Sequence, residues 1–104
     1  MILVIGGRNQ GKTDFVNKNF SEKRILNGFH EFVKDKLKIG ENVDLTEIYS
    51  NFDVVISDEL GCGLVPVEKF DRDWRETTGR YLCEIAKNSD KVYRVFAGIA
   101  VRIK

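Results

Sequence analysis

The first thirteen residues constrain this chain more than any other stretch. Four consecutive apolar residues, Ile2 to Ile5, run directly into a glycine-rich loop that ends in lysine and threonine. The loop fits the pattern G-x-x-x-x-G-K-[ST], which is informative when it follows a strand and precedes a helix. We therefore predict that a nucleotide binds through its phosphates to this loop, which consists of Gly6, Gly7, Arg8, Asn9, Gln10, Gly11, Lys12 and Thr13.

Each position of the loop has a mechanical reason. Glycines let backbone N–H groups point inward around phosphate oxygens, and the positive end of the following helix dipole adds to the attraction. Lys12 is expected to reach the β- and γ-phosphates as the catalytic cation, and Thr13 is expected to ligate Mg²⁺. The predicted cofactors are thus ATP or GTP together with Mg²⁺, and no base-reading motif distinguishes the two nucleotides.

Length and charge limit the remaining possibilities. The chain has 104 residues, which fits a single domain over residues 1–104. Its 17 basic and 16 acidic residues give a net charge of +1, so no overall field favours nucleic acid or a membrane surface as a partner. The initial apolar run is far shorter than the roughly 20 residues that span a bilayer, and we expect a cytoplasmic protein. Cys62 and Cys83 lack CxxC spacing and are interpreted as reduced packing residues.

Four stretches have the composition of β-strands. Residues 2–5 and 52–57 are continuous apolar runs, which is typical of strands buried on both faces of a parallel sheet. Residues 91–97 and 99–103 are two further β-type runs near the end of the chain. Their short separation fits either a hairpin or two strands with a kink.

Helical spacing of apolar residues occurs between these strands. It predicts helices over 12–20, 29–37 and 68–87, and Asp44 is the expected N-cap of a further short helix. Residues 21–27 hold few apolar residues and are either a short strand or a connection. Strands that alternate with helices predict an α/β fold in which helices cover a mostly parallel sheet.

Acidic residues flank the second buried strand. Asp58 and Glu59 directly follow residues 52–57, and open α/β sheets place their ligands at the carboxyl ends of strands. A phosphate loop needs a nearby acid that supports the metal through water, so Asp58 and Glu59 are candidates, with Asp53 at the start of the strand as a third. The alternative is that Asp58 and Glu59 belong to a solvated loop.

Three basic residues remain to be interpreted. His30 is the only histidine, and beside Phe29 on a predicted helix we interpret it as a surface or half-buried packing residue rather than a nucleophile. Arg72 and Arg75 lie about one turn apart on the helix over 68–87. They either clamp a phosphate or carboxylate, or form surface ion pairs with the acids around them.

Three stretches together resemble one enzyme family. MILVIGGRNQGKT, ISDELGCGLVPVEKFDRDWRETTGRYL and the closing VFAGIAVRIK are similar to the bifunctional adenosylcobinamide kinase and adenosylcobinamide-phosphate guanylyltransferase of cobalamin biosynthesis. In that family a strand ends in S/T-N-E-V-G-x-G-I-V-P and is followed by R-x-F-R-D-x-x-G. The first motif corresponds here to residues 57–66 and the second to residues 72–79.

The resemblance implies a fold and a reaction. The fold is a truncated P-loop NTPase-like three-layer α/β fold, and the reaction is phosphorylation of the hydroxyl of a cobinamide-type small molecule by a nucleoside triphosphate. Family members then transfer GMP from GTP through a guanylylated histidine, and they assemble as homotrimers. The residues that correspond to family motifs here are Gly6, Gly11, Lys12, Thr13, Glu59, Gly61, Gly63, Pro66, Arg72, Arg75 and Gly79.

The resemblance and the strand-end position together complete the list of candidate site residues. Glu59 and Arg75 are further catalytic candidates beside Lys12, and Asp58 is the candidate metal ligand beside Thr13.

The chain departs from the family in its middle. Family members are longer, and the missing part includes the segment that bears the guanylylated histidine, so that role is not carried over to His30. The family's strand with its metal-binding acid has no clear counterpart here, unless residues 25–27 are its remnant, in which case Asn27 stands where the acid is expected. Three hypotheses follow: a kinase-like transferase without support for the nucleotidyltransferase step, a nucleotide-binding regulatory module, and a kinase of another small alcohol.

Overall fold

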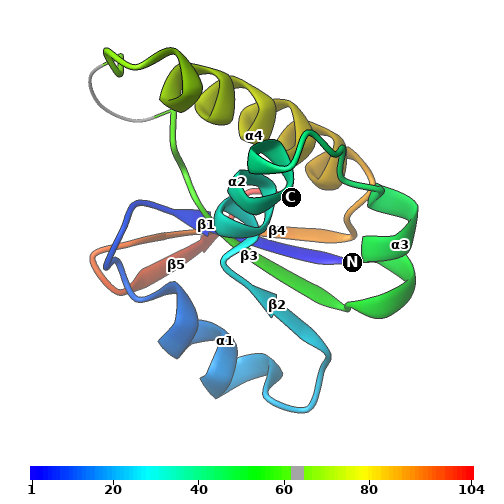
Figure 1. The fold of residues 1–104 in the computed structure, drawn as a ribbon. Coiled ribbons are helices and arrows are strands. Elements are labelled where there is room, and N and C mark those ends of the chain that lie inside the picture. Colours follow the sequence, from blue (N-terminus) through cyan, green and yellow to red (C-terminus); the bar gives the residue numbers. More distant parts are fainter. Residues whose placement is uncertain (62–64) are drawn as a thin grey trace.

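A computed structural model describes residues 1–61 and 65–104 and contains a five-stranded sheet with helices on both faces (Figure 1). The strand order is β2-β3-β1-β4-β5, in which only the last pair is antiparallel. The predicted α/β fold with a mostly parallel sheet and a C-terminal hairpin is confirmed. In chain order the elements are β1 (Ile2–Gly6), α1 (Lys12–Phe20), β2 (Ile25–Asn27), α2 (Phe29–Lys38), α3 (Leu45–Asn51), β3 (Val54–Asp58), α4 (Lys69–Lys87), β4 (Lys91–Phe96) and β5 (Ile99–Arg102).

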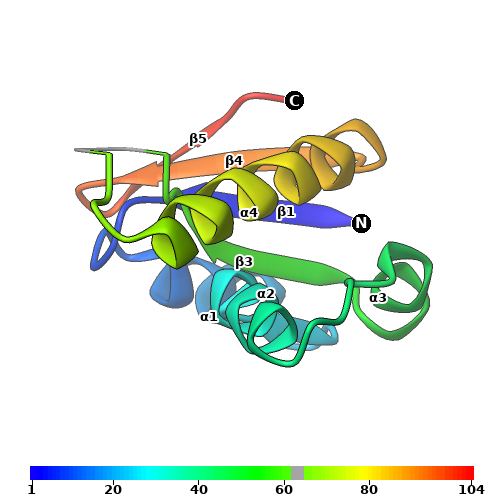
Figure 2. The ribbon, with the colours of Figure 1, turned by 45° about the horizontal axis from the view of Figure 1, so that its top comes forward.

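Two hydrophobic clusters make this a three-layer structure. Side chains alternate between the two faces of each strand, so Leu3 of β1 packs on one face and Val4 on the other. The cluster around Val4 includes Val16 of α1, whereas the cluster around Leu3 includes buried residues of α2, α3 and α4. Figure 2 shows α4 running alongside β1 and β4 on this second face.

The boundaries between α3 and β3 differ from the predicted strand over 52–57. Asp44 caps α3 as predicted, because its carboxylate accepts hydrogen bonds from the backbone N–H groups of Thr46 and Glu47. At the other end the N–H of Phe52 donates to the carbonyl of Ile48, at 3.0 Å, so the last helical turn takes Phe52 out of the strand. Residues 25–27 form the short strand β2, which settles the alternative left open for that segment.

Asp53 lies at the edge of the sheet opposite the glycine-rich loop. Its two carboxylate oxygens accept hydrogen bonds from Nη2 of Arg24 at 3.0 Å, Nε at 3.2 Å and the Arg24 backbone N–H at 3.0 Å. The guanidinium hydrogen bonds, followed by the backbone one, lower the pKa of Asp53 to about 2. Asp53 therefore joins β3 to the segment before β2. Because it lies at the opposite end of the strands from residues 6–13, it is not placed to support a metal ion at that loop.

Replacing Asp53 with asparagine is expected to lower stability at neutral pH but not near pH 2. The folded-state pKa lies below the unfolded value of about 3.9, so the stabilisation is present above pH 4 and is lost as the pH falls through about 2. Urea unfolding between pH 7 and pH 2 measures the difference in unfolding free energy between the wild type and Asp53→Asn, and this difference is expected to shrink as the pH falls. Asp73→Asn, which removes a surface pair with Lys69, is the control, and its difference from the wild type is expected to be smaller. A difference for Asp53→Asn that stays unchanged at pH 2 would contradict the assignment.

Two expectations from composition can be compared with this fold. Cys83 is exposed on α4, so its interpretation as a packing residue is wrong, and Cys62 lies outside the described residues. Within the described ranges, none of the helices is long and apolar enough to cross a membrane.

Candidate phosphate-binding site

The glycine-rich loop connects the end of β1 to the start of α1 and borders a cavity of about 480 Å³. Asn9 and Gly11 have positive φ angles of 59° and 96°, which turn the backbone around the cavity. Gly6 ends β1 at a point where a Cβ atom would collide with the carbonyl oxygen of Val95. The residues around the cavity are Arg8, Asn9, Gln10, Gly11, Lys12, Thr13, Asp14, Asn27, His30, Ile56 and Asp58.

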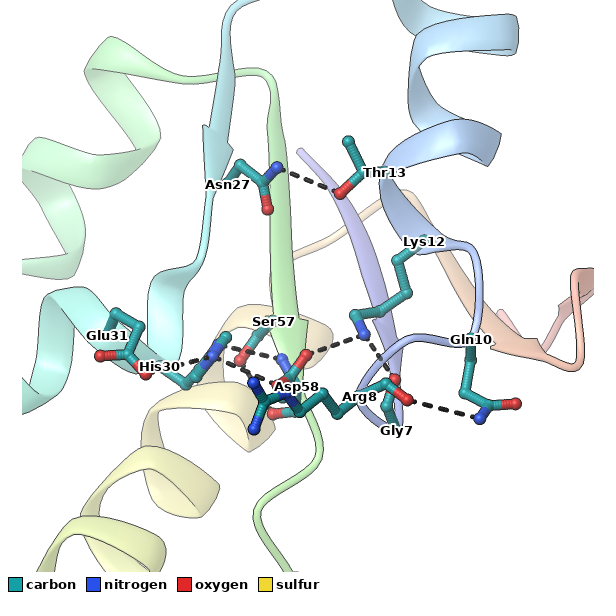
Figure 3. A network of polar contacts seen from close by, with 10 residues as sticks. All are labelled: Gly7, Arg8, Gln10, Lys12, Thr13, Asn27, His30, Glu31, Ser57 and Asp58. Carbon is teal, nitrogen blue, oxygen red and sulfur yellow. Dashed lines mark hydrogen bonds and ion pairs between the residues drawn. The ribbon is translucent and has the colours of Figure 1, made fainter.

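Lys12 is buried at this loop, with 7% of its surface exposed. Its Nζ donates to the carbonyl of Gly7 at 2.6 Å and lies 2.8 Å from Oδ1 of Asp58 (Figure 3). A buried ammonium needs a counter-charge, and Asp58 supplies it here. A bound phosphate would compete with that carboxylate for the same cation.

The turn between β4 and β5 donates backbone hydrogen bonds to the glycine-rich loop. The backbone N–H of Gly98 donates to the Gln10 carbonyl at 2.8 Å, and the N–H of Ala97 donates to Oε1 of Gln10 at 2.7 Å. A Cβ on Gly11 would lie 3.3 Å from the Cα of Gly98, so the two backbones pass close to each other. The C-terminal hairpin therefore holds the loop in its open shape.

Thr13 and Asn27 lie together on the other side of the cavity. Nδ2 of Asn27 donates to Oγ1 of Thr13 at 3.1 Å (Figure 3), which brings the end of β2 to the start of α1. Among residues 1–61 and 65–104, no three His, Cys, Asp or Glu side chains gather as a metal-binding cluster. The side-chain oxygens of Thr13 and Asn27 still fit Mg²⁺ beside a nucleotide, because Mg²⁺ keeps several waters and takes its remaining ligands from one or two protein oxygens and substrate phosphates.

His30 borders the candidate site, and it is half-buried against Trp74 as its interpretation as a packing residue predicts. Its Nδ1 accepts a hydrogen bond from the backbone N–H of Asp58 at 3.1 Å, and its Nε2 lies 3.3 Å from Oδ2 of Asp58. The imidazole stacks against Trp74, whose Nε1 donates to the His30 carbonyl at 2.7 Å. The sequence signal that could have located it is its place in the first turn of the helix that follows a strand end, where ligands bind.

A second cavity, of about 600 Å³, adjoins the first one. Three residues border both cavities, namely Arg8, His30 and Asp58. The remaining lining combines polar and apolar groups, so this cavity can accept a molecule larger than a phosphate. That lining consists of Gly7, Glu31, Glu59, Leu60 and Trp74.

The other predicted site residues lie around this second cavity or beyond it. Glu59 borders the second cavity and accepts a hydrogen bond from Nη2 of Arg94 at 3.0 Å. Nη2 of Arg75 donates to the carbonyl of Gly61 at 2.7 Å, and Arg75 borders neither cavity, so its catalytic role stays a prediction. Arg72 donates to the carbonyls of Pro66 and Val67. Gly63 lies outside the described residues.

One protein family and two of its characterised relatives match this chain. The family described as cobinamide kinase / cobinamide phosphate guanyltransferase (CobU) matches residues 34–103. The bifunctional adenosylcobalamin biosynthesis protein CobU of Salmonella typhimurium is 37% identical over 51 residues, and that of Escherichia coli is 35% identical over 51 residues. Each alignment covers 49% of this chain but only 28% of the relative. The family match starts at residue 34, so the phosphate loop is an independent observation.

Proposed function

Since the chain belongs to the cobinamide kinase / cobinamide phosphate guanyltransferase family, we propose that it binds a nucleoside triphosphate at residues 6–13 and transfers the terminal phosphoryl group to a cobinamide-type alcohol. The observation that carries the proposal is the position of Lys12. Its ammonium is held in the loop by the Gly7 carbonyl and Asp58, beside an open cavity of phosphate-binding size. The loop supports nucleotide binding, and the family supports the acceptor.

In this proposal each loop residue has a defined role. Backbone N–H groups of the loop and of the first turn of α1 surround the phosphates, and no side chain among the described residues caps that helix terminus. Lys12 binds the β- and γ-phosphate oxygens, and Thr13 offers its hydroxyl to Mg²⁺, while Asn27 orients that hydroxyl. Mg²⁺, when bound, neutralises charge that develops on the phosphates during transfer.

The guanylyl-transfer step does not form part of the proposal. A histidine nucleophile needs an accessible ring nitrogen with a free lone pair. Nδ1 of His30 already accepts a hydrogen bond from the backbone N–H of Asp58. The ring proton of the neutral imidazole is therefore assigned to Nε2, which lies near the carboxylates of Asp58 and Glu31. We infer that His30 is not guanylylated.

The test is incubation with labelled nucleotide, Mg²⁺ and adenosylcobinamide, followed by separation of the products. Label in the γ-position of ATP or GTP is expected to appear on adenosylcobinamide, and label in the α-position of GTP is expected to appear on neither protein nor acceptor. Stoichiometric binding without transfer would favour the regulatory-module hypothesis. Transfer to a different compound in a panel of small alcohols would replace the acceptor but keep the kinase reaction.

We also propose that the protein is a cytoplasmic homo-oligomer, a trimer by the family resemblance. Large apolar side chains remain exposed near the C-terminal hairpin, and a second copy would remove them from water. Those side chains are Phe96, Ile99, Val101 and Ile103. Light scattering on the purified chain measures the mass, and a monomer at tens of micromolar would contradict the proposal.

A further inference from the structure

The two cavities share one wall. Arg8 borders both from the loop, whereas His30 and Asp58 border both from α2 and β3. If the phosphates occupy the first cavity, a group in the second cavity meets the terminal phosphate at this wall. Asp58, His30 and Arg8 are therefore the side chains beside the point of transfer.

His30 holds Asp58 by two contacts at once. One is the hydrogen bond from the Asp58 backbone N–H to Nδ1, and the other brings Nε2 to 3.3 Å from Oδ2. Trp74 fixes the histidine in turn, through its hydrogen bond to the His30 carbonyl and through ring stacking. The side chain of His30 is only 13% exposed, so this arrangement has little freedom to rotate.

This geometry divides the chemical roles between the two residues. With Nδ1 engaged and the proton on Nε2, His30 has no free lone pair and cannot accept a proton from a substrate. Oδ2 of Asp58 lies 3.3 Å from that Nε2, and Oδ1 is paired with Lys12. Once phosphates bind Lys12, Oδ1 loses this partner and becomes a proton acceptor beside the second cavity.

We propose that Asp58 takes the proton of the acceptor hydroxyl and that His30 is the positioning residue that orients Asp58 for this step. The inference rests on the proposed function. The acceptor O–H bond breaks as its oxygen forms a bond to the γ-phosphorus, the proton passes to Oδ1 of Asp58, and the bond to the leaving nucleoside diphosphate breaks.

The Lys12–Asp58 ion pair also couples nucleotide binding to the transfer step. While Lys12 is paired with Oδ1, the carboxylate cannot serve the acceptor. Phosphates that bind Lys12 release Asp58, whichever of the two substrates binds first.

Asp58→Asn tests the role of Asp58 as proton acceptor. This substitution keeps the size of the side chain but removes the base, so transfer from MgATP or MgGTP to adenosylcobinamide is expected to fall by about 10²- to 10⁴-fold. Nucleotide affinity measured by calorimetry is expected to stay the same or rise, because the phosphates no longer compete with a carboxylate for Lys12. The Mg²⁺ concentration needed for half-maximal binding is expected to change less than threefold. Asp90→Asn makes the same chemical change at an exposed carboxylate paired with the N-terminus, and it is the control.

Two substitutions separate positioning from structure at His30. His30→Asn keeps an acceptor for the Asp58 N–H but has no nitrogen at the position of Nε2 beside Oδ2, and kcat is expected to fall by up to about 10²-fold with KM for nucleotide unchanged. His30→Gln places an amide N–H near the position of Nε2, and it is expected to recover part of kcat. Circular dichroism and the fluorescence of Trp74, the only tryptophan, report whether both variants fold.

Each result decides between the inference and the function on which it rests. A wild type that binds neither ATP nor GTP refutes the proposed function. A wild type that binds nucleotide but transfers phosphate to no acceptor refutes the phosphoryl-transfer part of the proposed function, and the inference fails with it, while the nucleotide site stands. Full transfer by Asp58→Asn, or a raised Mg²⁺ requirement in that variant, overturns the role as base. Equal kcat for His30→Asn and the wild type overturns the positioning role.

Discussion

Lys12→Ala is expected to abolish measurable binding of ATP and GTP. Hydrogen bonds to charged groups contribute about 1.5 to 3 kcal/mol each, so the loss of contacts to two phosphates weakens binding by roughly 10²- to 10⁴-fold. The substitution also leaves the carboxylate of Asp58, 2.8 Å from the ammonium in the native loop, unpaired beside the incoming phosphates. Titration calorimetry with MgATP and MgGTP measures the effect.

Matched variants make this result specific to the site. Lys18→Ala removes an exposed lysine from the last turn of α1, and its nucleotide affinity should equal that of the wild type. Asp58→Asn combined with Lys12→Ala removes the unpaired carboxylate, so it is expected to regain part of the lost affinity. If Lys12→Ala binds GTP as the wild type does, the assignment of the loop as the phosphate site is wrong.

The buried strands were predictable because they are apolar on both faces. Residues 2–5 alternate between two hydrophobic clusters. In a small α/β fold, a short stretch without polar residues is typical of a strand buried on both faces of the sheet. The start of β3 was predicted two residues early, because Phe52 is apolar but serves the last turn of α3. Periodicity alone cannot separate these cases, since helix termini and strands both bury such residues.

The phosphate loop was predictable for a local reason, and the rest of the site was not. Residues 6–13 are contiguous, so their spacing carries the geometry. His30 and Asp58 are 28 positions apart and meet only because β3 is parallel to β2, which directs both strand ends to one edge of the sheet. Asn27 is likewise brought to Thr13 by this pairing. With a three-residue β2 whose existence was open, neither contact followed from the sequence.

Among the substitutions proposed for this protein, Phe29→Ala is expected to lower the free energy of unfolding most. Phe29 is the first residue of α2 and is fully buried, with its ring 6.4 Å from that of Phe32 and 6.2 Å from that of Tyr81. Truncation of a buried phenylalanine removes its transfer free energy and leaves a cavity, which costs about 3 to 5 kcal/mol. Urea unfolding followed by the fluorescence of Trp74 measures the difference.

The Phe29 variant also tests whether the site depends on how α2 packs. His30 follows Phe29 directly, so a displaced first turn of α2 would loosen the contacts between His30 and Asp58 and reduce phosphoryl transfer even below the unfolding transition. Ile39→Ala removes a large apolar side chain that is 65% exposed, and its stability should change by less than about 0.5 kcal/mol. Phe29→Leu keeps most of the volume, so it should lose less stability and retain more transfer than Phe29→Ala. A Phe29→Ala protein as stable as Ile39→Ala would mean that α2 is anchored elsewhere, and the link from core packing to the site would fail.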